Sequence, residues 1–322
     1  MVFYFWAIFG LYIVKLLPVV EIVYIFDMPQ NNTILVTNII HGSYVDGPGM
    51  RTVFFLKGCP LACGWCHNPE TQKREQEILY DIRRCIRCGA CFDICNCRAI
   101  DYRRAYIIDL EKCTLCFRCV DVCPTDALQA AGTWMTVDAV MSEIVKDTVF
   151  YESSGGGVTF SGGEPLLQYR SLKEVLVLCR DKGIHTCIDT SLAVPWEIIA
   201  FVKDHVDLFM VDIKHSARKE VLPDLVFDNC EKLAGASRIW IRIPVIPDWN
   251  DTEEEMQKTA HRLESVKGKI EQVSLLPFHT GTEMKYRCLN RVWHGYGNKR
   301  AVSADTISLL NDVFIRNSFT VM

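Results

Sequence analysis

Six short apolar segments, rich in β-branched and aromatic residues, recur along this chain and alternate with stretches of helical spacing. The segments are residues 52–57, 158–161, 184–188, 207–213, 238–246 and 270–278. Buried strands that alternate with helices predict a parallel sheet with right-handed crossovers. Six such units are too few for a closed eight-stranded barrel. We therefore expect an α/β fold on one parallel sheet, with its strand ends on a common edge.

Capping residues mark several of the predicted helices. Helix starts are expected at Thr136, Ser171 and Thr252, because a hydroxyl side chain can accept a hydrogen bond from a free backbone N–H group. Ser171 and Thr252 are each followed three positions later by a glutamate, the pattern of a capping box. Gly183 stands where a glycine that ends a helix belongs.

The chain contains 16 cysteines, most of them separated from the next by two or three residues. Such gaps are typical of metal thiolates, whereas a disulfide framework is typical of small secreted domains. With 322 residues, of which 49% are hydrophobic, the chain can bury a large core without disulfides. We expect metal-bound thiolates and a reducing compartment, the cytoplasm.

Directly after the first predicted strand, Cys59, Cys63 and Cys66 follow the pattern C-x3-C-x2-C. Three thiolates are one ligand short of the four that a 4Fe-4S cluster usually takes from protein. One iron would then be open to a ligand that is not protein. A zinc loop, or three small side chains packed in a core, is the alternative interpretation.

Two flanking segments extend this motif: residues 46–51 (Asp-Gly-Pro-Gly-Met-Arg) and residues 63–70 (Cys-Gly-Trp-Cys-His-Asn-Pro-Glu). With them, the chain resembles the radical S-adenosylmethionine (radical SAM) enzymes, and among these the activating enzymes of glycyl radical enzymes. The resemblance runs from about Ile39 to the C-terminus. It implies a radical SAM partial (β/α)6 TIM barrel. It also implies an oxidoreductase that reductively cleaves S-adenosylmethionine and uses the 5′-deoxyadenosyl radical to form a glycyl radical on the C-terminal glycine loop of a partner enzyme.

The same resemblance assigns residues near the predicted strand ends to the cofactor and to a cation. The residues that would contact S-adenosylmethionine are Trp65, His67, Gly162, Gly163, Glu164, Asp189, Asp212, Lys214, Arg242 and His279. Those that would hold a monovalent cation through oxygen atoms are Asp189, Thr190, Asp212 and the backbone of Met210. Two alternatives stay open: Trp65 packs against the cluster, and Asp212 pairs only with Lys214.

Residues 81–126, here called the cysteine-rich insertion, contain two copies of the bacterial ferredoxin pattern. In that pattern the fourth cysteine of each run ligates the other cluster. The predicted sets are Cys85, Cys88, Cys91 and Cys123, and Cys113, Cys116, Cys119 and Cys95. Asn96 and Cys97 follow Cys95 where the family usually has Cys-Pro, so Cys97 is a competing ligand, although the spacing favours Cys95. Three 4Fe-4S clusters are thus expected. The cysteines without a motif, expected to pack as apolar residues, are Cys179, Cys187, Cys230 and Cys288.

These patterns divide the chain into residues 1–27, a hydrophobic extension; 28–80, the first part of the radical SAM core; 81–126, the insertion; and 127–322, the remainder of the core. The extension is long enough to cross a bilayer, but Lys15, Pro18 and Glu21 interrupt it. A charge at the bilayer centre costs about 2.5–3.5 kcal/mol on insertion scales. A start that is over-extended upstream of Met28, a membrane anchor and a segment packed elsewhere all stay open.

The expected partners follow from charge and chemistry. The net charge is −4 and no dense run of lysine or arginine occurs, so the sequence does not favour nucleic-acid binding. Flavodoxin or ferredoxin is the expected reductant. Two other functions compete with the activase: a radical SAM enzyme that acts on a small molecule, and a ferredoxin-type electron carrier. The electron carrier would have no use for the Gly-Gly-Glu-Pro segment at 162–165.

Overall fold

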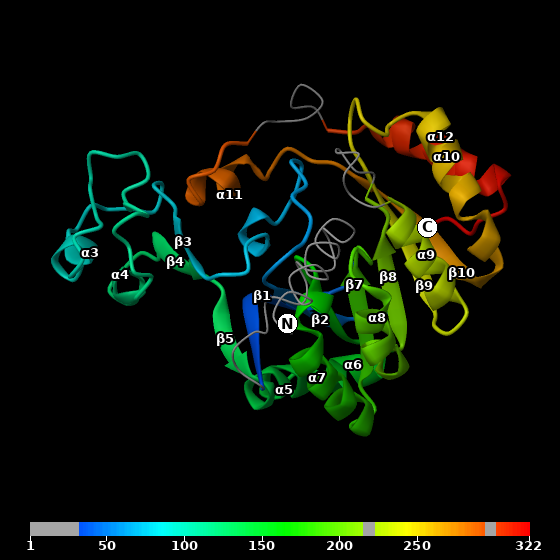
Figure 1. Ribbon diagram of the computed structural model, residues 1–322, viewed down its shortest axis with the longest axis horizontal. Coiled ribbons are helices and arrows are strands. Elements are labelled where there is room, and N and C mark those ends of the chain that lie inside the picture. Colours follow the sequence, from blue (N-terminus) through cyan, green and yellow to red (C-terminus); the bar gives the residue numbers. More distant parts are fainter. Residues whose placement is uncertain (1–31, 215–222, 294–300) are drawn as a thin grey trace, which may run out of the picture.

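The computed structural model describes residues 32–214, 223–293 and 301–322, and the hydrophobic segment 1–27 lies outside this part. Its main feature is an eight-stranded sheet in the order β10-β9-β8-β7-β6-β2-β1-β5 (Figure 1). The strands of this sheet are β1 (Thr33–Ser43), β2 (Arg51–Leu56), β5 (Thr133–Thr136), β6 (Gly157–Gly162), β7 (His185–Thr190), β8 (Leu208–Asp212), β9 (Ile239–Val245) and β10 (Ile270–Pro277).

The six predicted strands are present and parallel to one another, from β2 through β6, β7, β8 and β9 to β10. Their register aligns the carboxyl ends, since Leu56 lies opposite Gly162 and Asp212 lies opposite Arg242. The expected parallel sheet is thus confirmed. The carboxyl edge is where barrel enzymes place their chemistry.

Two antiparallel strands, which were not predicted, extend the sheet past β2. β1 pairs with β2 on one side and with β5 on the other. Ile34, Leu35 and Val36 at the start of β1 are buried, so this stretch is covered on both faces and lacks the alternation that marks a strand with one exposed face. β10 and β5 are the two edges, and the sheet is therefore open.

Helices cover the outer face of the sheet (Figure 1). The longer ones are α5 (Val137–Val145), α6 (Thr148–Ser154), α7 (Tyr169–Asp181), α8 (Trp196–Val202), α9 (Pro223–Ala234), α10 (Glu253–Arg262) and α12 (Ala304–Arg316). Apolar side chains of α5, α7, α8 and α12 join those of the strands in one core. The four cysteines without a motif are buried, as expected.

Two of the predicted caps are confirmed and one is wrong. The hydroxyls of Thr136 and Thr252 accept hydrogen bonds from the first turns of α5 and α10. Ser171 lies inside α7, which begins two residues earlier because the 3-10 turn η2 (Pro165–Gln168) runs directly into it. Gly183 follows α7 at φ 68°, the left-handed conformation in which the missing Cβ avoids a steric penalty.

The cysteine-rich insertion lies between β3 (Glu77–Tyr80) and β4 (Leu128–Ala131), which pair with each other in a separate two-stranded sheet. It contains two short helices, α3 (Ala90–Asp93) and α4 (Arg118–Asp121), and extends to one side of the main sheet (Figure 1). Its own small core includes Ile78, Ile100, Ile108 and Leu128. It therefore packs around apolar side chains distinct from those of the main core.

Glu77, at the start of β3, joins the insertion to the main sheet. Both of its carboxylate oxygens accept hydrogen bonds from Nη2 of Arg291, at 2.7 and 2.8 Å, and one of them accepts a bond of 3.0 Å from the Nζ atom of Lys57. Lys57 directly follows β2 and also donates to the carbonyl oxygen of Glu70. Both cations are largely buried, where charge-assisted hydrogen bonds are strong. This network fixes β3 against the end of β2, the strand that leads into the loop with the first cysteines.

Between residues 32 and 322, leaving aside the two undescribed gaps, no helix is both long and apolar enough to cross a membrane.

Candidate active site

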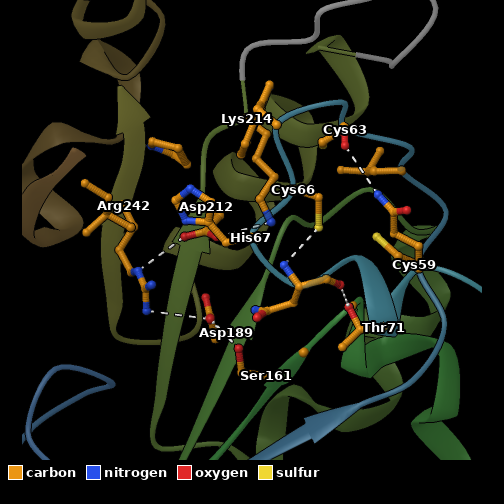
Figure 2. Close-up of a pocket in the computed structure, with 18 of the residues that line it drawn as sticks. Cys59, Cys63, Cys66, His67, Thr71, Ser161, Asp189, Asp212, Lys214 and Arg242 are labelled. Atoms are coloured by element: carbon orange, nitrogen blue, oxygen red, sulfur yellow. Dashed lines mark hydrogen bonds and ion pairs between the residues drawn. The ribbon is translucent and has the colours of Figure 1, made fainter. Parts of the chain in front are cut away.

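A cavity of about 230 Å³ opens at the carboxyl edge of the parallel strands, and residues from all six of these strands or from the segments that follow them line it (Figure 2). The predicted site residues that line it are Cys59, Cys63, Trp65, Cys66, His67, Gly162, Gly163, Asp189, Asp212, Lys214 and Arg242. Those that do not are Glu164, Thr190, Met210 and His279. Most of the predicted residues are thus gathered at one place by the sheet register.

The loop that carries the first three cysteines begins where β2 ends. The backbone N–H of Cys59 bonds to the carbonyl oxygen of Gln72 at 3.0 Å, and the hydroxyl of Tyr286 donates to the carbonyl oxygen of Cys66 at 3.1 Å. Burial raises the pKa of the Cys59 thiol to about 12 and that of Cys66 to about 11. A coordinating metal deprotonates a thiol outright, so these buried thiols suit metal binding.

In residues 32–214, 223–293 and 301–322, no three cysteine, histidine or carboxylate side chains already form a metal site. The cysteines of the loop all face the same cavity (Figure 2). Five buried side-chain atoms at this cavity also lack a hydrogen-bond partner within the described residues. Oδ1 of Asp212 and Nε of Arg242 face each other as an ion pair, whereas Nε1 of Trp65, Nε2 of His67 and Oδ1 of Asp189 face the cavity without a hydrogen bond. Buried polar atoms are normally paired, so these residues fit a polar ligand such as S-adenosylmethionine beside a cluster.

The two glycines after β6 allow close packing of the chain against itself. A Cβ atom on Gly162 would lie 2.3 Å from the backbone nitrogen of Leu56, and one on Gly163 would lie 2.2 Å from the carbonyl oxygen of Gly58. Gly162 also has φ 111°, where other residues are strained. These glycines therefore hold the end of β6 against the start of the cysteine loop.

Glu164, a predicted cofactor contact, lies outside the lining of the cavity. It is fully buried, and its carboxylate accepts hydrogen bonds from the hydroxyls of Thr190 and Ser191, both at 2.7 Å, and from the backbone N–H groups of Ser191 and Leu166. Burial raises the pKa of this carboxyl. Glu164 and Thr190 thus join the ends of β6 and β7 and support the cavity from outside.

Charged side chains from β7, β8 and β9 meet on one side of the cavity (Figure 2). Nη1 of Arg242 lies 3.6 Å from Oδ2 of Asp189, and its Nε lies 3.3 Å from Oδ1 of Asp212. Burial raises the pKa of Asp189 to about 6, although Arg242 acts in the opposite direction. Nζ of Lys214 lies 3.2 Å from Oδ2 of Asp212. The pairing of these two residues, which was the alternative interpretation, is therefore present, and both residues also line the cavity.

The predicted cation ligands are spread over two strands. Asp189 and Met210 are opposite each other in the register of β7 and β8. The sulfur of Met210 lies 4.0 Å from Nη1 of Arg242, and Thr190 uses its hydroxyl on Glu164. Asp189 and Asp212 are the two members of the set that face the cavity.

His67 and His279 form a stacked pair with ring centroids 4.0 Å apart, and Phe278 lies 5.3 Å from His67. His279 is exposed. Burial lowers the pKa of His67 to about 4, and the neighbouring His279 acts in the same direction. Trp65 is buried against Ile246 and Phe278 and also lines the cavity, which combines the two roles considered for it.

Five polar residues at the cavity were not among the predicted contacts: Asp46, Asn68, Thr71, Gln72 and Ser161. Ser161 donates a 2.6 Å hydrogen bond to Asp189, and Asn68 and Asp46 line the wall. Asp46 lies 3.9 Å from Nη1 of Arg242. Ser161 could have been identified because it precedes the two glycines at the end of a predicted strand, where the side chain reaches the carboxyl edge.

Each half of the insertion contains a small cavity lined by cysteines. The first is lined by Cys85, Cys88, Cys91 and Cys123, among other residues. The second is lined by Cys95, Cys97, Cys113, Cys116 and Cys119, among other residues. The predicted exchange of the fourth cysteine between the two halves is thus consistent with the cavities, and Cys95 and Cys97 lie side by side in the second.

Comparison with known proteins gives the class. A model of the radical SAM superfamily matches residues 110–263. A 4Fe-4S dicluster domain matches residues 84–127, and a 4Fe-4S single cluster domain matches residues 45–94. The open parallel sheet, with thiols and paired charges at its carboxyl edge, is that of a radical SAM enzyme with a ferredoxin-like insertion. It uses S-adenosylmethionine and several 4Fe-4S clusters.

Curated relatives narrow the class. The (2S)-3-sulfopropanediol dehydratase activating enzyme of Klebsiella oxytoca is 40% identical, with 81% of this chain and 87% of the relative covered. The benzylsuccinate synthase activating enzyme of Thauera aromatica is 39% identical over 80% and 82%. The trans-4-hydroxy-L-proline dehydratase activating enzyme of Clostridioides difficile is 42% identical over 81% and 89%. The chain belongs to the activating enzymes of glycyl radical enzymes: it is an oxidoreductase that installs a glycyl radical on a partner glycyl radical enzyme.

Proposed function

We propose that the cavity at the carboxyl edge is the site where this chain cleaves S-adenosylmethionine and passes the radical to its partner. The observation that carries this proposal is the meeting of three thiols and five charged side chains at one cavity. A 4Fe-4S cluster held there by Cys59, Cys63 and Cys66 and reduced by one electron would supply the electron that breaks a carbon–sulfur bond of the cofactor, and the 5′-deoxyadenosyl radical so formed would remove a hydrogen atom from a glycine of the partner. The protein supplies binding, orientation and exclusion of water.

In this proposal Cys59, Cys63 and Cys66 ligate the catalytic cluster and leave one iron for the cofactor. Two aromatic residues shield one side of this cavity from solvent, since Trp65 is 6% exposed and Phe278 is 1% exposed. A radical formed there meets few other hydrogen donors. Tyr286 holds the backbone of Cys66 and thereby keeps the cluster loop close to the cavity.

The charged side chains of the cavity bind the methionine part of the cofactor, which carries an ammonium and a carboxylate besides the sulfonium. Asp189 and Asp212 complement positive groups, and Lys214 and Arg242 complement the carboxylate. Trp65, His67 and the backbone at Gly162 and Gly163 complete the pocket. Glu164 acts as a positioning residue because its oxygens are engaged by β7 and the turn after β6. His279 acts through its stacking on His67.

A monovalent cation is a further candidate ligand of the acidic side chains of this cavity. Asp189 and Asp212 line the cavity with oxygen atoms that a hard cation prefers. Thr190 and the backbone of Met210, on the same two strands, would complete the set. A cation there would offset the repulsion between the two carboxylates.

The partner's glycine loop is proposed to approach past residues 46–49. The carbonyl oxygen of Asp46 accepts from the hydroxyl of Thr159 at 2.6 Å, and that of Pro48 accepts from Nη1 of Arg51 at 3.0 Å. Arg51 is fully buried and also donates to Thr159 at 2.6 Å. These bonds hold the side chain of Asp46 at the cavity wall, where it can meet the backbone of an incoming peptide.

The insertion is proposed as an electron relay with two clusters, held by the sets predicted above. The proposed division of the chain into residues 28–80, 81–126 and 127–322 is consistent with a separate electron relay, because the insertion has its own core. Cys88 and Cys116 are exposed and offer the shortest route from a docked carrier. Flavodoxin or ferredoxin is the proposed reductant. A reducing compartment, the cytoplasm, suits thiolate-bound clusters.

The cofactor site is tested by Asp189→Asn, which keeps the shape of the side chain but removes its charge. Binding of S-adenosylmethionine to the anaerobically reconstituted protein is measured by calorimetry, with Asp204→Asn as the control because Asp204 is exposed. We expect the dissociation constant to rise at least about tenfold in Asp189→Asn, the effect of about 1.4 kcal/mol, and to stay unchanged in the control. Equal affinity in both variants would reject this cavity as the cofactor site.

A further inference from the structure

The two halves of the insertion differ in their number of thiols. The first cavity is lined by four cysteines and the second by five, because Cys95 and Cys97 both reach it. Four thiolates complete the ligand set of a 4Fe-4S cluster. On the proposed function of the insertion, the second cavity therefore holds one thiol more than its cluster needs.

The thiols of Cys95 and Cys97 compete for a single ligand position on the cluster. The Sγ atoms of Cys95 and Cys97 are 3.6 Å apart. Two thiolates on one tetrahedral metal ion, with metal–sulfur bonds of about 2.3 Å, are separated by about 3.8 Å. Their separation therefore directs both sulfurs at the same iron, whereas each iron of a 4Fe-4S cluster accepts one protein thiolate.

The local backbone explains why both side chains point inward. The N–H of Arg98 bonds to the carbonyl oxygen of Cys95 at 3.1 Å, and Arg98 adopts φ 49°, a left-handed conformation that tightens the turn. The N–H of Ala99 bonds to the sulfur of Cys95 at 3.2 Å. Asn96, between the two cysteines, is exposed. The turn thus presents residues 95 and 97 to the same cavity and residue 96 to the outside.

The other half of the insertion provides an internal control. There the fourth cysteine, Cys123, is followed by Pro124 and Thr125. Thr125 takes the place that corresponds to Cys97, and its hydroxyl lies 3.9 Å from the sulfur of Cys123. A hydroxyl at this place cannot replace a thiolate as a soft ligand for iron. The first cluster has one possible fourth ligand, and the second has two.

We propose that Cys97 is a second, interchangeable ligand for the iron that Cys95 binds, so that the cluster of the second cavity survives loss of either thiolate. The exchange conserves charge: the entering thiol gives up its proton as it binds, and the departing thiolate takes one up. The fold thereby protects one of its two relay clusters against oxidation or modification of its fourth ligand.

The proposal is tested in the Cys59→Ala/Cys63→Ala/Cys66→Ala background, in which only the insertion clusters form. The anaerobically reconstituted protein is treated briefly with iodoacetamide, and modified cysteines are mapped by peptide mass spectrometry, while iron per chain is measured in parallel. In this background we expect about eight irons, four for each cluster, and one reactive thiol shared between Cys95 and Cys97. In Cys95→Ala, Cys97 becomes protected and the iron content is retained; Cys97→Ala gives the mirror result.

Two controls define the outcomes. Cys123→Ala, which has no second thiol, and the double variant Cys95→Ala/Cys97→Ala should each lose iron or give the electron paramagnetic resonance signal of a three-iron cluster. The proposal is overturned if Cys97 reacts equally fast with and without Cys95, if either single variant behaves like the double one, or if the double variant keeps both four-iron clusters. A background protein with fewer than two clusters would overturn the relay function of the insertion itself, and the ligand exchange with it.

Discussion

The cavity at the edge of the main sheet and the two cavities of the insertion are both lined by cysteines, yet they differ in what accompanies the thiols. The main cavity combines three thiols with Asp189, Asp212, Lys214 and Arg242. The insertion cavities have four and five thiols among mainly apolar side chains, and each has a single arginine in its lining. The main cavity, with three thiols and paired charges, suits a cluster that binds an additional ligand. The insertion cavities, with at least four thiols in an apolar surrounding, suit clusters that transfer electrons.

This difference shows how one chain can separate two uses of the same cofactor. Solvent access and polarity around a cluster set its potential and its reactivity. In the main cavity, unpaired polar atoms on Trp65, His67 and Asp189 await a ligand. In the insertion the surrounding residues are tyrosines, isoleucines and leucines, which leave little for a small molecule to bind. The predictions below test that contrast.

The largest effect is expected from Cys59→Ala/Cys63→Ala/Cys66→Ala. Cleavage of S-adenosylmethionine should fall to background, while iron per chain falls by about a third, because one of three four-iron clusters is lost. Iron and sulfide assays after anaerobic reconstitution check this. Loss of all the iron would show that the two regions do not assemble independently.

Arg242→Met should have the next largest effect, because it removes the cation paired with the buried carboxylate of Asp189 and leaves Asp212 with Lys214 alone. Breaking a buried ion pair costs about 3–5 kcal/mol, and we expect a comparable loss shared between folding stability and cofactor affinity. Calorimetry and thermal unfolding measure the two parts. Arg238→Met, directly before the same strand, is the control, since Arg238 pairs with Glu271 at the surface and should change both by less than about 1 kcal/mol. Equal effects of the two variants would contradict the role of Arg242.

Glu164→Gln should have an intermediate effect. Each carboxylate oxygen of Glu164 accepts a backbone N–H, from Leu166 or from Ser191, so the amide NH2 group of glutamine would face a donor. An unsatisfied buried group costs about 1–3 kcal/mol, and the free energy of unfolding should fall by that amount in denaturant titrations. Glu143→Gln, at an exposed pair with Lys146, is the control. An unchanged stability would mean that these bonds do not hold β6 against β7.

Cys88→Ala should have the smallest effect on the main cavity. Cys88 lines the first insertion cavity, so the affinity for S-adenosylmethionine should stay within about twofold, a difference near 0.4 kcal/mol. Reduction of the catalytic cluster by flavodoxin should slow, as followed by stopped-flow absorbance. A large loss of cofactor affinity would show that the two regions are coupled through more than electron transfer.

The sequence alone predicted the sheet and most of the cavity. The apolar segments between residues 52 and 278 form the six parallel strands, and their pairing aligns Asp189, Asp212 and Arg242 at one edge. Cysteine spacing predicted which thiols share each insertion cavity. These features depend on local patterns and on a register that the fold class already implies.

Other features depend on long-range packing, which a single sequence does not encode locally. The role of Glu164 depends on Thr190 and Ser191, which are 26 and 27 residues away. The bond between Arg291 and Glu77 spans 214 residues. The capping box at Ser171 was wrong because a preceding 3-10 turn moved the start of α7. In each case a tertiary contact decided between local alternatives.

The most direct test of the whole account is formation of a glycyl radical on a partner. The reduced enzyme and S-adenosylmethionine are mixed anaerobically with each member of a panel of purified glycyl radical enzymes, and electron paramagnetic resonance is recorded. The account predicts a glycyl radical signal on at least one of these enzymes, together with 5′-deoxyadenosine in proportion to the radical. The absence of a radical on all of them and on a peptide that copies their glycine loop, together with turnover of a metabolite at the cost of one 5′-deoxyadenosine per cycle, would contradict it.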